Sequence, residues 1–183
     1  MKMKKLLVTG GCGFIGSNFI RYFLKERPEW GVINVDKLSY SGNRENLREL
    51  AGDPRYEFIL GDICGKALVS KVTERADAVV HFAAETHVDR SIDSADDFLR
   101  TNVLGTASLL EASLARKIGR FVHMSTDEVY GSIRKGKFKE DAPLKPNSPY
   151  SASKAAADLL VRSFQVTHQH PAMIVRCTNN YGP

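Results

Sequence analysis

Short apolar runs alternate with segments of helical periodicity along most of the chain. Leu6, Leu7 and Val8 form the first run, and Ile15 and Phe19 belong to a pattern of helical spacing that follows it. Several runs are apolar almost throughout, as expected of strands that are covered on both faces. The alternation predicts an α/β fold, a doubly wound parallel sheet of the Rossmann type with helices on both faces. We expect strands at residues 5–9, 32–36, 56–60, 78–82, 121–125 and 173–176.

The segments between the strands have helical patterns, except for one that has the composition of a loop. Residues 130–149 contain Gly131, Gly136 and three prolines, and they join the fifth strand to the last helix. This loop would lie at the carboxyl edge of the sheet, where ligands bind in open α/β folds. We expect helices at residues 14–25, 44–50, 66–75, 94–116 and 150–167.

Length, composition and charge exclude several classes of protein. The 183 residues suit one domain with a core of its own. No apolar run approaches the ~18 residues that span a bilayer, and Leu6-Leu7-Val8 is too short for the core of a signal peptide. We therefore expect a cytoplasmic protein with no membrane contact. The net charge of +5 is mild, and its densest cluster, residues 134–139, is interpreted as solvated surface, so no nucleic-acid partner is expected.

The chain has three cysteines, Cys12, Cys64 and Cys177, and no Cys-x-x-Cys spacing. An odd number of widely spaced cysteines indicates a reducing compartment and no structural zinc. His168 and His170 have no further ligands nearby in the sequence, so we expect them to be solvent-exposed and expect no metal site.

A glycine-rich turn follows the first strand. Gly10, Gly13 and Gly16 would provide a tight turn, a close approach of the backbone to a pyrophosphate and close packing of helix on strand. The pyrophosphate would lie at the positive end of the helix that Phe14 and Ile15 begin. A plain glycine-rich turn is the alternative for this pattern taken alone.

Acidic and small residues at the ends of the next strands complete the expected dinucleotide site. Asp36 ends the second strand about twenty residues after the turn, where an acid meets the ribose hydroxyls. Its charge would repel a 2′-phosphate, which favours NAD over NADP, although Lys37 beside it weakens this preference. Asp62 and Ile63 would contact the adenine, unless Asp62 caps the following helix. Phe82-Ala83-Ala84 would let a flat ligand approach the fourth strand, unless it forms an ordinary turn.

A tyrosine and a lysine share one face of the last expected helix. Tyr150 and Lys154 are four residues apart, which places the phenol and the ammonium one helical turn from each other. The ammonium would lower the pKa of the phenol and let it accept a proton near neutral pH. Together with the glycine turn, the pair indicates oxidation of a carbohydrate or an alcohol by a nicotinamide cofactor.

Thr126, Asp127 and Glu128 leave the fifth strand at the edge where this helix arrives. The threonine can share a hydrogen bond with a substrate hydroxyl beside Tyr150. One of the two carboxyl groups can remain ionised while its neighbour's charge, or burial, raises the pKa of the other. Such a pair can move two different protons, beyond the single proton of an alcohol oxidation. An acidic surface turn is the alternative.

These motifs make the sequence resemble the extended short-chain dehydrogenase/reductases and, within that superfamily, the dTDP-glucose 4,6-dehydratases. The resemblance runs the whole length of the chain, and its most specific element is Thr126-Asp127-Glu128. It is carried by TGGCGFIGSN at 9–18, DKLSY at 36–40, AAETHVDRS at 83–91, STDEVYG at 125–131, Tyr150 with Lys154, and NNYGP at 179–183.

The resemblance implies a dehydratase mechanism with dTDP-glucose as substrate. Tyr150, activated by Lys154, would take the proton of the sugar's 4-hydroxyl while a hydride passes to NAD⁺. Glu128 would remove the proton at C5, and Asp127 would protonate the departing C6 hydroxyl. Return of the hydride to C6 would give dTDP-4-keto-6-deoxyglucose and leave the cofactor unchanged and tightly held.

The resemblance also assigns roles to residues outside the main motifs and implies a homodimer for the full-length form. Asn102 would support the tyrosine–lysine helix, unless it only satisfies backbone groups. Further residues beside the cofactor would be Lys37, Leu38, Ser39, Thr101 and Asn180. Residues that approach the substrate would be His87, Thr126 and Asn179.

Two other functions stay open beside the dehydratase. A nucleotide-sugar 4-epimerase would share the fold and the tyrosine–lysine pair, but Asp127 and Glu128 argue against it. The third alternative is a dinucleotide-binding module without activity, because the family's C-terminal lobe, which grips the nucleotide diphosphate, is not among these residues. We therefore expect residues 1–183 to form one NAD-binding domain that stops before the substrate-binding lobe.

Overall fold

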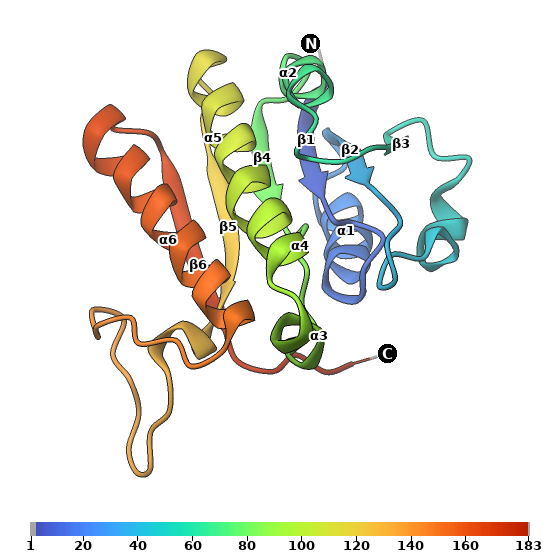
Figure 1. The fold of residues 1–183 in the computed structure, drawn as a ribbon. Coiled ribbons are helices and arrows are strands. Elements are labelled where there is room, and N and C mark those ends of the chain that lie inside the picture. The colour runs from blue at the N-terminus through green and yellow to red at the C-terminus, as the bar shows by residue number, and fades with distance from the viewer. Residues whose placement is uncertain (1–2, 183) are drawn as a thin grey trace.

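The computed structural model describes residues 3–182 and contains the expected parallel sheet (Figure 1). The strand order is β3-β2-β1-β4-β5-β6, so the direction in which the chain adds strands reverses between β1 and β4. Every neighbouring pair of strands is parallel. The bounds are Lys4–Thr9 for β1, Trp30–Asp36 for β2, Tyr56–Leu60 for β3, Ala78–His81 for β4, Phe121–Thr126 for β5 and Ala172–Cys177 for β6. The fold class and the expected strands are confirmed.

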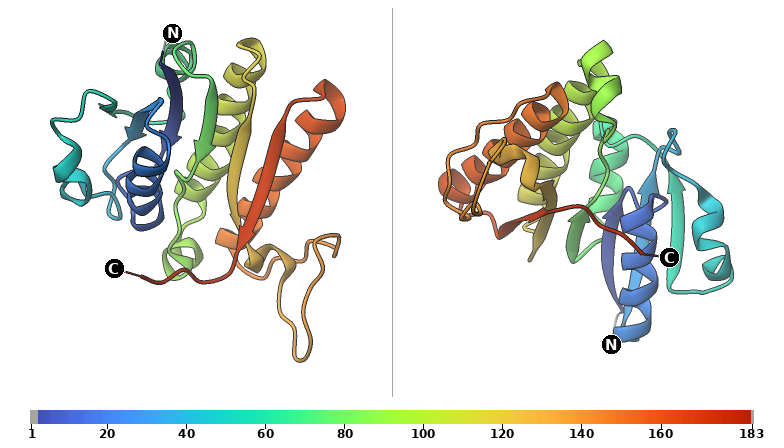
Figure 2. Two further views of the ribbon diagram at one scale, coloured as in Figure 1. Left: turned by 180° about the vertical axis from the view of Figure 1, so that it is seen from behind. Right: turned by 90° about the horizontal axis from the view of Figure 1, so that it is seen from below.

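Helices cover both faces of the sheet (Figure 2). One face carries α1 (Phe14–Glu26) and the 3₁₀ helix η1 (Arg44–Leu50), and the other carries α2 (Lys66–Thr73), α5 (Thr106–Ala115) and α6 (Pro149–His168). A hydrophobic core lies on each side, because successive side chains of a strand point to opposite faces. Along β1, Leu6 and Val8 belong to the core under α1, whereas Leu7 belongs to the core under α5 and α6.

The helix expected at residues 94–116 is present at residues 96–115, but its middle part is π-helical. The chain forms α4 (Asp96–Phe98), the π-helical segment η2 (Leu99–Gly105) and then α5. The Thr106 hydroxyl donates a 2.6 Å hydrogen bond to the main-chain oxygen of Asn102, a type of bond that competes with regular helix geometry. Short π-helical segments are frequent at functional sites, and this one holds Thr101 and Asn102 in buried positions.

Two short elements have no counterpart in the sequence pattern. These are α3 (Val88–Asp93) and the 3₁₀ helix η3 (Asp127–Tyr130). With six and four residues, they are too short to show a helical period. The start of η3 is capped by Thr126, whose hydroxyl oxygen accepts a hydrogen bond from Glu128 N at 3.2 Å.

Local sequence determines where α6, the helix of the tyrosine–lysine pair, begins. Ser148 is the N-cap, and its hydroxyl oxygen accepts a hydrogen bond from Ser151 N at 3.1 Å. The Ser151 hydroxyl oxygen in turn accepts one from Ser148 N at 3.0 Å, which completes a capping box. Pro149 occupies the first turn, where its missing N–H leaves no helical bond unmade. The main chain of Tyr150 is thereby fixed at the carboxyl edge of the sheet.

The two histidines after α6 differ in environment. His168 is exposed as expected, but His170 is buried against the rings of Phe121 and Phe164. Burial, followed by the charge of His168, lowers the pKa of His170. Across residues 3–182, no group of three or more His, Cys, Asp or Glu side chains is placed to hold a metal ion.

Two segments extend the carboxyl edge of the sheet. The loop at residues 131–148 projects from this edge, which confirms its expected position (Figure 1). Residues 178–182 follow β6 and cross the same edge (Figure 2). Pro183, the last residue of the NNYGP motif, lies outside the described residues. None of the helices in the described part of the chain has the length and apolar character to span a membrane.

Candidate active site

A cavity of about 480 Å³ opens between the segments that follow the six strands β1 to β6. It includes the ends of β1 and β4, between which the strand order reverses, and ligands bind at such a switch point in open α/β sheets. The expected site residues that line the cavity are Gly10, Gly13, Phe14, Ile15, Gly16, Asp36, Lys37, Ser39, Ile63, Phe82, Ala83, Ala84, Thr101, Thr126, Glu128, Tyr150, Lys154, Asn179 and Asn180.

Leu38 and Asp62, which were expected beside the cofactor, do not line this cavity. The main-chain N–H of Leu38 donates a 2.8 Å hydrogen bond to the Asp36 carboxylate and so positions the acid, and contact of Leu38 with the cofactor stays a prediction. The Asp62 carboxylate accepts a 2.8 Å hydrogen bond from Cys64 N. The N-cap of α2 is Gly65, so the alternative in which Asp62 caps that helix is wrong.

His87 and Asp127 also lie outside the cavity lining. His87 is exposed at the start of α3, and its ring packs edge-on against Tyr40 with 5.9 Å between ring centroids. The Asp127 carboxylate accepts a 3.4 Å hydrogen bond from the Thr126 hydroxyl. Contact of His87 or Asp127 with a substrate therefore stays a prediction.

The glycine-rich turn leaves room for an anion at the start of α1. Gly10 has a φ of 72°, and a Cβ there would lie 2.5 Å from Ala83 N, so a larger residue would strain the turn and collide. A Cβ at Gly13 would meet only Gly10 O, at 3.5 Å. Gly13 caps α1 without a side-chain hydrogen bond, and the first turn has no acidic residue. Because the first N–H groups of a helix lack partners within it, this helix start fits a pyrophosphate.

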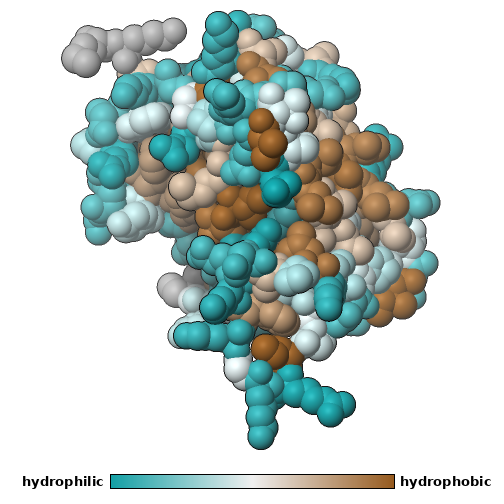
Figure 3. All heavy atoms as spheres, turned by 90° about the vertical axis from the view of Figure 1, so that its left-hand side faces the viewer, coloured by the Kyte–Doolittle hydropathy of each residue, from teal (hydrophilic) through white to brown (hydrophobic). Residues whose placement is uncertain are grey.

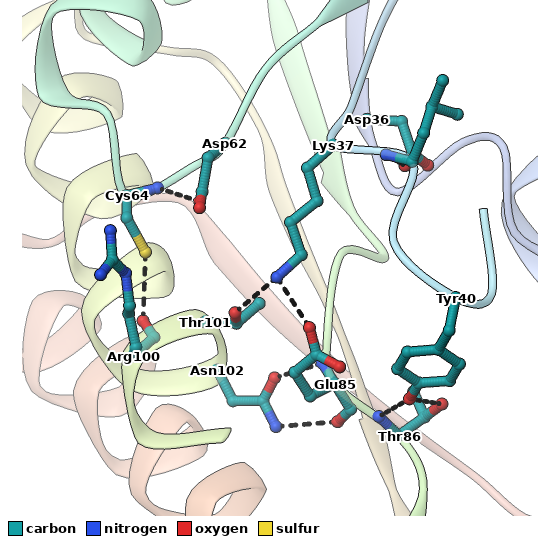
Figure 4. A network of polar contacts seen from close by, with 11 residues as sticks. Asp36, Lys37, Tyr40, Asp62, Cys64, Glu85, Thr86, Arg100, Thr101 and Asn102 are labelled. Carbon is teal, nitrogen blue, oxygen red and sulfur yellow. Dashed lines mark hydrogen bonds and ion pairs between the residues drawn. The ribbon is translucent and has the colours of Figure 1, made fainter. Parts of the chain in front are cut away.

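At the end of β2, Asp36 and Lys37 point in different directions (Figure 4). The Asp36 carboxylate accepts main-chain hydrogen bonds from Cys12 at 2.9 Å and from Leu38 at 2.8 Å. The Lys37 side chain extends away from that carboxylate, and its ammonium forms an ion pair with Glu85 at 2.7 Å. The acid is thus oriented by the backbone, and the neighbouring cation is already neutralised.

Asn102 joins the segment after β4, where it bonds to Glu85 (Figure 4), to α6, where it bonds to Ser153. Its side-chain oxygen accepts a 2.8 Å hydrogen bond from Glu85 N, and its amide nitrogen donates to Glu85 O at 3.0 Å and to the Ser153 hydroxyl at 2.8 Å. This bond to α6 confirms that Asn102 supports the tyrosine–lysine helix. A further bond, from Tyr150 N to the Ser91 hydroxyl oxygen at 3.1 Å, holds the first turn of the helix to α3.

Tyr150 and Lys154 are both buried at the cavity. The Lys154 ammonium donates a 2.6 Å hydrogen bond to Met124 O, and burial lowers the pKa of Lys154 to about 8. Burial and the charge of Glu128 raise the pKa of Tyr150 to about 12, and a hydrogen bond with Thr126 opposes this shift. The expected lowering of the phenol's pKa is therefore wrong for this geometry, because desolvation outweighs the neighbouring hydrogen bond.

Glu128 is the member of the acidic pair that lines the cavity, together with Thr126. Glu128 is exposed at the cavity, and its partial desolvation there, followed by the charge of Asp127, raises its pKa. A carboxylate with a raised pKa is a stronger proton acceptor. The geometry therefore suits Glu128 to a role as a base on a molecule bound beside Tyr150.

A buried polar cluster, which the sequence pattern did not single out, joins α6 to β5 and β6. Asp158 follows Lys154 by one helical turn, and its carboxylate accepts a 2.7 Å hydrogen bond from the Arg176 side chain. The same carboxylate lies 3.5 Å from the His123 ring nitrogen Nε2. Arg176 also donates to the Tyr130 hydroxyl at 2.6 Å.

The cavity also has lining residues that were not expected there. One is Ser125, whose hydroxyl is buried and has no hydrogen-bond partner within the described part of the chain. Ser125 and Thr86 belong to the STDEVYG and AAETHVDRS motifs, so the resemblance contained the information that would have identified them. The complete set comprises Val35, Ser41, Gly42, Gly61, Thr86, Met124, Ser125, Cys177 and Thr178.

The tyrosine–lysine pair of α6 shares one cavity with the glycine-rich start of α1 at the switch point of a Rossmann-type sheet. This arrangement defines the class of the short-chain dehydrogenase/reductases. Within that class, the model of the family described as GDP-mannose 4,6 dehydratase matches residues 7–183. The chain belongs to this family.

Individual relatives narrow the comparison. The dTDP-glucose 4,6-dehydratase of Actinoplanes sp. is 51% identical over 184 residues, which cover 98% of this chain and 58% of that protein. The structure of DesIV, a dTDP-glucose 4,6-dehydratase from Streptomyces venezuelae with NAD and TYD bound, superimposes on this chain with a TM-score of 0.95 and 51% sequence identity. The match covers 98% of this chain and 57% of the DesIV chain. A UDP-glucose 4-epimerase from Thermotoga maritima, with 30% identity and a TM-score of 0.88, is more distant. The chain thus spans little more than half the length of these relatives.

Proposed function

We propose that this chain is the cofactor-binding part of an NAD-dependent dTDP-glucose 4,6-dehydratase, a hydro-lyase that forms dTDP-4-keto-6-deoxyglucose. The observation that supports this best is that Glu128 lines the same cavity as Tyr150 and Lys154. Oxidation of an alcohol needs one proton acceptor, whereas loss of water across C5 and C6 needs a second base. Identity to dTDP-glucose 4,6-dehydratases over nearly the whole chain supports the same substrate.

The residues around the switch point fit NAD. The start of α1 would hold the pyrophosphate, Asp36 would contact a ribose, and Ile63 with Thr101 would border the adenine. The small residues Ala83 and Ala84 leave room for a flat ring, and Asn180 lines the same cavity. Bound NAD would supply the hydride acceptor and donor for the sugar.

Tyr150 would accept the proton of the sugar's 4-hydroxyl, with Thr126 orienting that hydroxyl. With a pKa of about 12 the phenol is protonated at neutral pH, so its activation requires a positive charge nearby. Lys154, whose pKa is about 8, is already charged one helical turn away at neutral pH, so the further positive charge would have to come from the nicotinamide ring of bound NAD⁺. The pair would therefore work best in a range where Lys154 is still protonated.

Glu128 would remove the proton at C5 once C4 is oxidised, because the new ketone acidifies that position. Asp127 would protonate the departing C6 hydroxyl, and its carboxyl group would have to turn from Thr126 toward the cavity to do so. His87 and Asn179 would contact the sugar nucleotide. In a protein of the relatives' length, a further lobe would bind the nucleotide. The binding energy of that nucleotide would hold the sugar in position beside the catalytic residues.

Two alternatives make different predictions for the reaction. A 4-epimerase would use Tyr150 and Lys154 but has no need of a base at C5, and the greater distance of the epimerase relative speaks against it. A binding module without activity would retain NAD and leave dTDP-glucose unchanged. Under each of the three functions, residues 1–183 are proposed to form one NAD-binding domain.

A homodimer of the full-length form would use the apolar side of α6 and η2. Hydrophobic side chains gather on the side of the molecule where α6 lies (Figure 3). The exposed large apolar residues of these two elements are Leu99, Leu104, Leu159 and Val166. Two copies that pair these helices would bury this surface, as apolar patches of oligomers do. The cytoplasmic location stays a prediction from the sequence.

The direct test is incubation of a protein of family length with dTDP-glucose and NAD, followed by mass spectrometry of the sugar nucleotide for loss of water and proton NMR for the configuration at C4. The dehydratase predicts loss of one water and no net consumption of NAD. A product of unchanged mass with inverted C4 would favour the epimerase. Retention of NAD with unchanged dTDP-glucose would favour the binding module.

A further inference from the structure

Lys37 is the side chain beside Asp36 that could reverse the proposed cofactor preference. Among the described residues that line the cavity, Lys37 and Lys154 are the two cations, and Lys154 is bound to Met124 O next to Tyr150. A cation that follows the ribose-binding acid is the kind of group that accommodates the 2′-phosphate of NADP. The preference therefore depends on where the Lys37 ammonium is held.

The Lys37 side chain extends away from Asp36, and its ammonium lies beside Glu85 and Thr101 (Figure 4). It lies 2.7 Å from the Glu85 carboxylate and 3.1 Å from the Thr101 hydroxyl. The Glu85 side chain is only 9% exposed, and its main chain is bonded on both sides to Asn102. Burial disfavours the charged lysine, but the hydrogen bond and charge of Glu85 outweigh it, and the net shift raises the pKa of Lys37.

We propose that Glu85 is a specificity-determining residue for the cofactor, because it holds the Lys37 ammonium away from the ribose that Asp36 would contact. This inference rests on the proposed binding of NAD and adds a second discriminating residue to Asp36. If Lys37 turned to bind a 2′-phosphate, the Glu85 carboxylate would stay buried without its counter-ion, which is costly in a protein interior. The ribose 2′-hydroxyl of NAD makes no such demand.

Isothermal titration calorimetry with NAD⁺ and NADP⁺ on the wild-type protein and on Glu85→Gln tests this role. Glutamine keeps the size of the side chain and the main-chain bonds to Asn102 but has no charge, so Lys37 is released. We expect the ratio of NADP⁺ affinity to NAD⁺ affinity to rise roughly tenfold, the effect of one charge-assisted hydrogen bond. The gain should shrink with added salt and should vanish when Lys37→Met is added to Glu85→Gln.

Two further variants make the result specific. Glu111→Gln is the matched control, because it removes the carboxylate of the exposed Lys66–Glu111 ion pair at 2.9 Å and should leave the ratio unchanged. Glu85→Asp keeps the charge on a shorter side chain, which holds the Lys37 ammonium less closely. This variant should therefore raise the ratio of NADP⁺ affinity to NAD⁺ affinity by less than Glu85→Gln does. It serves as the test if Glu85→Gln does not fold.

The possible outcomes separate this inference from the proposed function. A wild-type protein that binds NAD⁺, together with an unchanged affinity ratio in the folded Glu85 variant, would overturn the role of Glu85 alone. A wild-type protein that does not bind NAD⁺ would overturn the proposed function and the role of Glu85 with it. A raised ratio that depends on Lys37 supports both.

Discussion

The Lys154 ammonium on α6 donates a 2.6 Å hydrogen bond to the main-chain oxygen of Met124 on β5. Met124 is two residues before Thr126, so this bond couples the tyrosine–lysine helix to the strand that leads into the acidic pair. Lys154 is 4% exposed, and burial lowers its pKa to about 8. The domain therefore holds a desolvated charge at neutral pH, at a cost to its own stability.

Lys154→Met should raise the free energy of unfolding at pH 7 by ~2 kcal/mol. A shift of the lysine pKa from 10.5 to about 8 corresponds to roughly 3 kcal/mol, and loss of the bond to Met124 offsets about 1 kcal/mol of it. Because the folded pKa lies below the unfolded one, wild-type stability from this group rises with pH between about 8 and 10.5. The advantage of the variant should therefore disappear by about pH 10.

Urea unfolding of both proteins at pH 7 and pH 10 measures this difference. Titration of other groups affects both proteins alike, so the wild type at each pH is the control. A variant that is less stable than wild type at pH 7, or a difference that does not change with pH, would contradict the assignment of a desolvated Lys154.

Asp158→Ala should lower the free energy of unfolding by about 3 kcal/mol. The Asp158 side chain is 1% exposed and the Arg176 side chain 21% exposed, so removal of the carboxylate leaves a largely buried guanidinium without its partner. Glu111→Ala, which breaks the exposed pair with Lys66, should cost less than about 0.5 kcal/mol. Urea unfolding gives both values, and equal small losses would show that the buried pair contributes no more than a surface one.

Asp36→Asn should narrow the preference for NAD and also weaken the fold. Both carboxylate oxygens accept main-chain N–H groups, from Cys12 and Leu38, whereas an amide can accept on one side only. One buried N–H then loses its partner, which costs about 1–3 kcal/mol. Calorimetric titration with both cofactors and thermal unfolding test the two effects. Equal or tighter binding of NADP by the wild type would contradict the preference itself.

The strands could be predicted because strands buried on both faces are nearly continuous apolar runs. The π-helical part of the helix at residues 96–115 could not, because it depends on the bond from Thr106 to Asn102 and on Asn102's partners in other elements. The glycine turn and the tyrosine–lysine pair follow from local spacing. Burial has no local signature, so the raised pKa of Tyr150 and the buried His170 could not be predicted.

Contacts between residues far apart in the sequence were the least predictable part of the site. The ion pair of Lys37 with Glu85 forms because β2 and β4 end at the same edge of the sheet on either side of β1. Nothing near Lys37 in the sequence indicates that its charge is already paired. The position of Asp127 outside the cavity likewise results from the turn of η3, which is too short to leave a pattern.

Tyr150→Phe in a protein of family length should abolish oxidation of the sugar at C4, because the cavity then offers no phenol to accept the 4-hydroxyl proton. The change removes one oxygen atom and leaves Lys154, Met124 and the Asn102 contacts in place, so NAD binding should persist. A single-turnover experiment that follows absorbance of the reduced cofactor checks this. Oxidation at a near-normal rate would remove Tyr150 from the proposed mechanism.

The central claim, that Glu128 removes the C5 proton of an oxidised sugar, is tested most directly by C5 deuterium exchange in heavy water. In a Glu128→Gln protein of family length, Tyr150 and Lys154 are unchanged, so oxidation at C4 should continue. An amide cannot accept the proton, so C5 exchange and water loss should slow by ~10²–10⁴-fold, and reduced cofactor with 4-keto-glucose should accumulate. C5 exchange at the wild-type rate in this variant would contradict the claim.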